Sequence, residues 1–256
     1  EKFYKVFCKK TQSKNGMWEQ RFFTDGKLAP CWGYQVDETA SVVYGVFEHY
    51  KYTKSIKFLK DNLQMCEKAT DFLKRYVEDW LEINVKDDRE KDIVKEQREN
   101  EMGSTKGHKY HISYDLWEMN EGIHLYSLAS IYSAFDSMIN IYENLGKNTS
   151  DFDNNRLKEE KISKSKKELE KMKVEIKKYI NQNMYDENKK SYIRNTEDRK
   201  MDISILGAIT PFSVFKAKEK KIQNTVERIN LSLRTYTGGY QRFEDDNYMN
   251  GNPWTI

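Results

Sequence analysis

The feature that most constrains the fold is an alternation along the chain between apolar segments and amphipathic ones, nearly all with helical spacing. Residues 37–53 place apolar side chains on one face behind an acidic first turn, and residues 55–82 repeat apolar side chains at intervals of three and four. Such spacing is typical of helices with one buried face and one solvated face. We therefore expect a helix over each of these ranges.

The same alternation continues towards the carboxyl end. Residues 122–142 are apolar and nearly uncharged, which predicts a helix buried on most sides. Residues 156–183 are rich in lysine and glutamate and carry only a thin apolar stripe, and the alternating charges favour an outer helix over a basic binding surface. Residues 202–215 are again apolar and residues 219–233 again amphipathic. Buried helices are thus expected to alternate with half-exposed ones three times.

Alternating inner and outer helices are what a toroid of helical hairpins requires. A helical solenoid would show the same alternation, but it would also show a repeated sequence period, which this chain lacks. Strand signals are confined to three short stretches, EQRFF, KSYIRN and GGYQRFE, which are expected to form short hairpins in loops. Residues 84–110 are polar and aperiodic, so we expect a loop or a marginal helix there. The predicted class is therefore all-α.

Composition excludes several kinds of partner. The chain has 44 basic and 41 acidic residues, interleaved, so its net charge of +3 argues against nucleic-acid binding by an overall field. Cys8, Cys31 and Cys66 lie far apart with no CxxC pair, so neither a disulfide framework nor a metal site is indicated. No apolar run approaches the roughly 18 residues of a membrane span. We expect no cofactor, no metal and no membrane partner.

One stretch, YDLWEMNE at residues 114–121, combines aromatic and acidic residues just before an apolar run. A purely structural interpretation is helix entry, because carboxylates favour the unpaired N–H groups at a helix N-terminus. The functional interpretation is a sugar-binding site, where aromatic faces hold a pyranose ring and one desolvated carboxyl keeps its proton. CWGYQVDE at 31–38 and the segment 238–254 share this composition and also precede expected inner helices. Three such loops at one mouth would converge on one site.

At residues 18–50, 114–135 and 238–254 the sequence resembles glycoside hydrolase family 15, the glucoamylases and glucodextranases. A single DLWE would be a weak signal, whereas three motifs in order and at fitting spacing are a strong one. The resemblance implies an (α/α)6 toroid of six hairpins, of which residues 1–256 would supply about half. On this interpretation the chain is one partial catalytic domain with both ends truncated.

The resemblance also implies roles for the residues of the YDLWE motif. Glu118 matches the family's general acid, and burial beside Trp117 and Tyr114 would raise its pKa above the roughly 4.3 of free glutamate, as an acid working near neutral pH requires. Asp115 and Trp117 are expected to contact or support the sugar in the innermost subsite. Met119 stands where the family usually has a second glutamate, which removes one polar contact on the aglycone side.

The resemblance assigns further substrate-binding residues in the two other loops. Arg242 matches the family arginine that grips sugar hydroxyls, because a rigid fork of donors suits vicinal oxygens. Asp246 is expected to be a partner of that arginine rather than a catalyst, and Trp32 is expected to line the sugar site. The family's catalytic base is not found in this sequence and is expected beyond Ile256.

Three other polar residues are expected to be structural. His124 lies in an apolar helical segment, which indicates a packed histidine with a local partner. Asp37 and Glu38 are expected to stabilise the start of their helix, near the mouth of the site.

The implied activity is inverting, exo-acting hydrolysis that releases glucose from the non-reducing ends of α-glucans or maltooligosaccharides. Two alternatives remain open: a non-catalytic carbohydrate-binding or regulatory toroid, and trehalose hydrolysis on the same scaffold. Retention of Glu118 argues against a pure binding module, since such a module has no need of a desolvated acid. Because the base is expected beyond Ile256, residues 1–256 alone are expected to be inactive.

Overall fold

The computed structural model describes residues 1–31, 33–85, 112–147, 156–251 and 253. Most of the polar segment 84–110 and the side chain of Trp32 therefore lie outside the described residues. The five long helices of the described part are α2 (Val36–Thr53), α3 (Ile56–Val85), α5 (Leu125–Lys147), α7 (Arg156–Asn183) and α8 (Lys220–Leu233). None of the described helices is both long enough and apolar enough to span a membrane.

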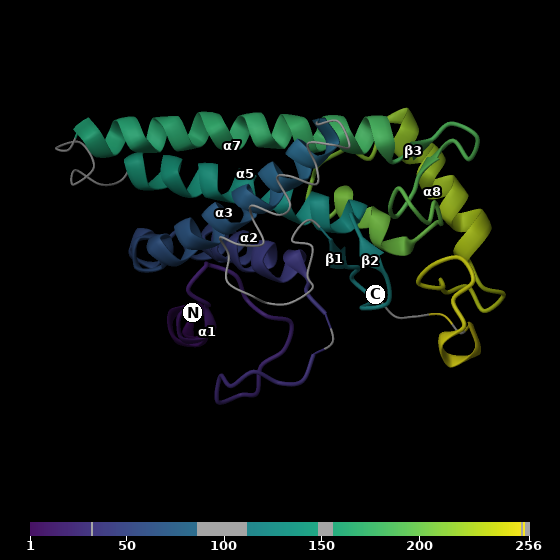
Figure 1. Cartoon of the computed structure of the whole chain (residues 1–256), viewed down its shortest axis with the longest axis horizontal. Coiled ribbons are helices and arrows are strands. Elements are labelled where there is room, and N and C mark those ends of the chain that lie inside the picture. The colour runs from purple at the N-terminus through teal and green to yellow at the C-terminus, as the bar shows by residue number, and fades with distance from the viewer. Residues whose placement is uncertain (32, 86–111, 148–155, 252, 254–256) are drawn as a thin grey trace.

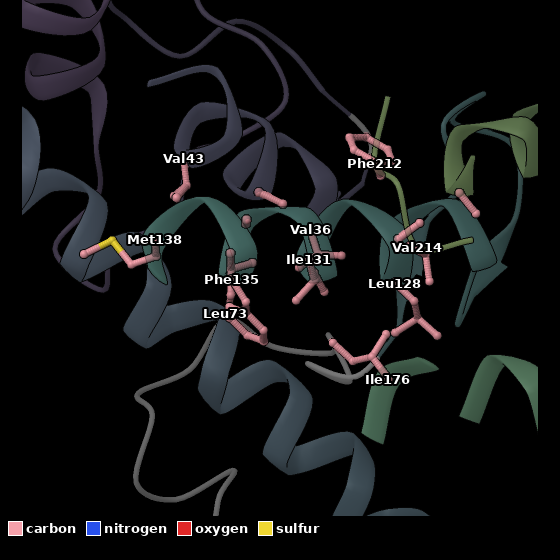
Figure 2. Close-up of a cluster of buried hydrophobic side chains, with 14 of the residues drawn as sticks. Val36, Val43, Leu73, Leu128, Ile131, Phe135, Met138, Ile176, Phe212 and Val214 are labelled. Carbon is pink, nitrogen blue, oxygen red and sulfur yellow. The ribbon is translucent and has the colours of Figure 1, made fainter. Parts of the chain in front are cut away.

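Among the first four long helices, α2 and α5 are the inner elements, and α3 and α7 cover them. Helix α5 contacts α2, α3 and α7, and α2 also contacts α3 (Figure 1). Fifteen of the 23 residues of α5 are buried, because this helix is surrounded by its neighbours. Figure 2 shows the resulting core, in which Ile131 and Phe135 of α5 lie among side chains from α2, α3 and α7. The expected alternation of buried and half-exposed helices is confirmed for these four elements.

The outer character of α7 is visible in its burial pattern. Its expected apolar stripe faces the core through four buried residues, namely Leu169, Met172, Ile176 and Ile180. Its lysines and glutamates are mostly exposed or paired on the surface, as in the ion pair between Lys178 and Glu175. The expectation of a solvated helix rather than a basic binding surface fits this arrangement.

The third apolar segment forms a shorter helix than the sequence indicates. Instead of a long helix over 202–215, the chain forms the 3-10 helix η2 (Ile203–Ala208) and then turns. Gly207 lies against the ring of Tyr126, where a Cβ atom would come within 2.7 Å of the ring. Pro211 follows and cannot continue a helical hydrogen-bond ladder. Most side chains of residues 202–215 are still buried, but no α-helical hydrogen-bond ladder runs through the segment.

Short β elements decorate the loops, as expected. Strand β3 (Tyr185–Asp186) pairs with β4 (Ser191–Tyr192), the latter lying in the KSYIRN stretch. Isolated bridges join Phe22 to Leu28 and Arg234 to Tyr240, within the other two stretches or beside them. The remaining short helices are η1 (Phe3–Cys8), α1 (Lys9–Thr11) and η3 (Tyr248–Gly251).

A further hairpin, not expected from the sequence, precedes α5. Strand β1 (Ser113–Tyr114) pairs antiparallel with β2 (Glu121–Gly122), with Ser113 opposite Gly122 and Tyr114 opposite Glu121. The YDLWEMNE stretch is therefore a β-hairpin with its loop over 115–120, and helix entry begins only after it, at Leu125. The helix-entry interpretation of its carboxylates is wrong for this reason.

Candidate functional site

The hairpin loop 115–120 is organised by the carboxylate of Asp115. Its Oδ1 accepts hydrogen bonds from the backbone N–H of Met119 at 2.8 Å and of Asn120 at 3.3 Å, and its Oδ2 accepts one from the Asn120 side chain at 2.9 Å. The Asp115 side chain is buried. The Asp115 carboxylate thus faces its own loop and holds that loop in shape.

Glu118 lies in this loop with a backbone angle φ of +60°. The left-handed region costs a residue other than glycine on the order of 1–3 kcal/mol, and it persists only where the surroundings impose it. Here the Glu118 N–H donates to the Asp115 carbonyl at 3.0 Å, and the Asp115 side chain holds the next two residues. The hairpin therefore fixes the backbone of Glu118 in a strained position.

The loop before α2 forms the base of the hairpin. The Tyr114 N–H donates to the Tyr34 carbonyl at 2.8 Å, and the Gln35 side chain donates to the Asp115 carbonyl at 2.6 Å. The Tyr114 ring lies so close to Gly33 that a Cβ atom there would come within 2.2 Å of it. Two of the three aromatic and acidic loops are therefore in direct contact, at the point in the chain that follows Trp32.

Trp117 is held by a residue that precedes η2. Its indole Nε1–H donates to both carboxylate oxygens of Asp202, each at 3.1 Å. Asp202 is almost fully buried and also accepts the backbone N–H of Ser204 at 2.8 Å. Burial raises the pKa of Asp202 to about 6, although its hydrogen bonds from Ser204 and Trp117 oppose that shift.

The third loop contributes Arg242 and Asp246 as a buried pair. The Arg242 Nε donates to one oxygen of Asp246 at 2.8 Å, and its Nη2 donates to the other at 2.7 Å. Although burial acts to raise it, these hydrogen bonds hold the pKa of Asp246 below its ordinary value. The Arg242 guanidinium lies 5.7 Å from the Trp117 ring centroid and 4.7 Å from that of Tyr248. The third loop therefore meets the hairpin at Trp117.

Charged residues of the amino-terminal loop and of the start of α2 also act on the surroundings of Glu118. Arg21, in the amino-terminal loop, donates a hydrogen bond from Nη2 to the Glu118 carboxylate. Burial raises the pKa of Glu38 to about 7, the charges of Asp37 and Glu118 add to this, and the charge of Arg21 opposes it. Burial also raises the pKa of Asp37 to about 6. The two acids at the start of α2 thus belong to the electrostatics of the site as well as to the helix.

His124 joins the hairpin to the loop after β4. Its Nε2 lies 3.0 Å from the Asn120 carbonyl, and its Nδ1 lies 3.4 Å from the Asn195 side chain. The ring is buried, and burial lowers its pKa, so the imidazole is neutral near neutral pH. The expectation of a packed histidine with a local partner is confirmed.

Two residues of the site were not singled out from the sequence. Asp202 stands directly before an apolar segment, as the three aromatic and acidic loops do, so the same rule applied to lone acids would have found it. Arg21 gives no such signal, because its contact with Glu118 joins positions 97 residues apart. Within the described residues no three His, Cys, Asp or Glu side chains are grouped as metal ligands would be.

Taken together, the described residues offer an acid on a rigid loop, aromatic faces beside it and a braced arginine. Such a set can hold a sugar ring and deliver a proton to an oxygen that leaves it. Trp32, expected as part of the same wall, lies outside the described residues.

Comparison with known proteins gives one family. The family model described as glycosyl hydrolases family 15 matches residues 6–256. A curated relative, an uncharacterized glycosyl hydrolase of Methanocaldococcus jannaschii, is 23% identical over 250 residues, which cover 98% of this chain and 34% of that protein.

Solved structures agree in fold. A wild-type glycosidase superposes with a TM-score of 0.65 at 17% identity, covering 94% of this chain and 52% of that one. A glycosidase variant in complex with glucose gives 0.64 at 16% identity, with the same coverage. The chain therefore spans about a third of the curated relative and about half of the solved chains, which is consistent with half of an (α/α)6 toroid.

Proposed function

Because the chain belongs to glycosyl hydrolases family 15, we propose that the protein containing it hydrolyses glycosidic bonds by an acid-assisted mechanism with Glu118 as the proton donor. The observation that carries this proposal is the placement of Glu118 on a strained hairpin loop directly after Trp117. Strained backbone at an ionisable residue is a common mark of an active site, where the surrounding structure offsets its cost.

The other residues take supporting roles in this proposal. Trp117 and Tyr114 offer aromatic faces to the sugar, while Asp115 fixes the loop that carries the acid. Arg242 donates to sugar hydroxyls with a guanidinium oriented by Asp246. By its place in the first motif, Trp32 is proposed as a further sugar-binding residue.

The finer assignment is exo-acting, inverting release of glucose from α-glucans or maltooligosaccharides. A solved glycosidase variant with the same fold is described as a complex with glucose, which supports a glucoside substrate for the present protein. Inversion needs a second carboxyl roughly 6.5–9.5 Å from the acid, so that water fits between base and sugar. We place that base outside residues 1–256, in the remaining hairpins of the toroid.

The test is the variant Glu118→Gln in the whole protein. Turnover of maltooligosaccharides should fall by several orders of magnitude while binding is nearly kept, because the amide preserves the shape but gives up no proton. Turnover within about threefold of the parent would remove Glu118 from the mechanism.

Stereochemistry and completeness are tested separately. Proton NMR of the fresh product should show β-glucose first, and α-glucose first would refute inversion. Residues 1–256 expressed alone should bind sugar weakly and hydrolyse little. Hydrolysis of maltose by this segment at an ordinary enzymatic rate would place the base inside it.

A further inference from the structure

We propose that Arg21 is a positioning residue for Glu118, and that the ion pair between them fixes the direction and the charge of this carboxyl before substrate binds. The inference rests on the proposed function only for its consequence in catalysis. Its structural basis is the contact between the Arg21 guanidinium and the Glu118 carboxylate, which joins the amino-terminal loop to the catalytic hairpin.

The backbone of Arg21 is anchored by a closed turn. The N–H of Ala29 donates to the Arg21 carbonyl at 3.0 Å, and Phe22 bridges to Leu28 in the same turn. The ring of Phe22 packs edge-on against Phe7, with centroids 6.0 Å apart. The guanidinium is therefore presented from a defined loop, although its side chain is partly exposed.

The same loop is also linked to the base of the hairpin, through the side chains of Gln20 and Gln35. Gln20, the neighbour of Arg21, donates to the Gln35 side chain at 2.8 Å, and Gln35 donates to the Asp115 carbonyl at 2.6 Å. Gln20 and Arg21 thus reach two points of the hairpin loop: Gln20 reaches Asp115 through Gln35, and Arg21 contacts Glu118 directly. Such a two-point attachment fixes the distance between the guanidinium and the acid.

The charges around the pair give Arg21 an electrostatic role as well. Helix α2 contributes Asp37 and Glu38, the hairpin contributes Asp115 and Glu118, and all of these are acids. Tyr126 of α5 lies in the same field, since burial raises its pKa to about 12 and the charges of Asp37 and Glu38 add to that shift. Arg21 opposes this negative field, so its removal should make Glu118 take up a proton more readily.

A bound sugar would change this balance. A resting carboxylate held by the Arg21 guanidinium keeps its direction. A glycosidic oxygen only accepts hydrogen bonds, so it becomes the partner of Glu118 once the carboxylate has taken up a proton from water, and that proton is the one delivered to the leaving oxygen. The catalytic consequence is that Arg21 sets how the acid points before it acts.

The test follows the Glu118 carboxyl itself, without turnover. The whole protein is labelled with ¹³C at glutamate carboxyls, the Glu118 signal is assigned by its loss in Glu118→Gln, and its titration midpoint is measured. We expect Arg21→Gln to raise the midpoint and Arg21→Lys, which keeps the charge, to return it most of the way. Lys27→Gln, on the same turn but exposed, is the matched control and should leave it unchanged.

Kinetics then separate the inference from the function. In Arg21→Gln the alkaline limb of the kcat profile should move to higher pH, while kcat at the optimum falls several-fold and KM changes less. An unmoved Glu118 midpoint in Arg21→Gln overturns the inference even if Glu118→Gln is inactive. A raised midpoint together with normal turnover of Glu118→Gln supports the placement of Arg21 and refutes Glu118 as the acid.

Discussion

The indole Nε1 of Trp117 lies 3.1 Å from each carboxylate oxygen of Asp202, a residue 85 positions further along the chain. This contact ties the hairpin that carries Glu118 to the first turn of η2. Asp202 is braced in turn by the backbone of Ser204 and by Arg194, whose Nη1 lies 3.8 Å from it. The orientation of the aromatic face beside the proposed acid therefore depends on a buried carboxylate outside the hairpin.

Replacing this carboxylate tests the dependence. Asp202→Ala removes a buried carboxylate and leaves the partly buried Trp117 N–H without its acceptor, so we expect a loss of about 1–3 kcal/mol in the free energy of unfolding. Sugar binding in the whole protein should also weaken. Denaturant unfolding measures the first effect, and Asp71→Ala, at an exposed surface acid, should stay within about 0.5 kcal/mol of the parent. Equal losses in the two variants would mean that Asp202 has no special role.

Gly33 offers a steric test of the junction between the first loop and the hairpin. In Gly33→Ala the new Cβ would lie 2.2 Å from the Tyr114 ring, so the ring must move, at a cost of roughly 1–3 kcal/mol. Gly146→Ala is the matched control, because nothing lies within 4 Å of its added Cβ and alanine is the better helix former. We expect thermal unfolding to show a lower Tm for the first variant and an unchanged or higher one for the second.

Breaking the buried pair of Arg242 and Asp246 is expected to cost more free energy of unfolding than breaking an ion pair on the surface. Removing the acid alone in Asp246→Ala leaves a buried guanidinium without its bidentate partner, which costs about 3–5 kcal/mol. Glu175→Ala breaks an exposed ion pair with Lys178 and should cost less than about 1 kcal/mol. Chemical denaturation of both variants decides the point: similar losses would show that Arg242 finds another partner.

Long-range periodicity explains why the helical frame was predictable. Helices α2, α3, α5 and α7 were expected within a few residues of their bounds, because each repeats its apolar residues over several turns. The hairpin around Glu118 was not expected, since strands of two residues are too short to show alternation. The third inner segment was overestimated, because Gly207 and Pro211 interrupt a helix without interrupting burial.

The candidate site was predictable only in part, for a related reason. The family resemblance named the residues in the three motifs and also named Asp246 as the partner of Arg242, whereas the partners of Trp117 and Glu118 could not be named. Asp115 was expected to contact or support the sugar, and the sequence did not indicate that its carboxylate accepts hydrogen bonds from its own loop. Asp202 and Arg21 lie 85 and 97 residues from the hairpin residues they contact, so no local sequence pattern points to either partner. Tertiary contacts of this kind follow from packing, not from spacing.

Glu38 gives a prediction about pH and stability. Its pKa is raised from 4.5 to about 7 in the folded protein, chiefly by burial, so between these values the folded state binds the proton more tightly than the unfolded state. The free energy of unfolding should therefore fall as pH rises through this range, by at most about 1.4 kcal/mol per pH unit from this residue. Asp37 and Asp202 act in the same direction, with pKa values near 6.

The variant Glu38→Gln isolates this contribution. Glutamine resembles the protonated acid in shape, so the variant should match the parent at about pH 4.5 and exceed its stability at about pH 8, where the parent holds a disfavoured carboxylate. Unfolding in urea at the two pH values measures the difference. Glu187→Gln, at a largely exposed position, should give parallel curves. A stability gain for Glu38→Gln that is the same at both pH values would show that the charge of Glu38 does not oppose folding. In that case Glu38 would have no part in the electrostatics around Glu118.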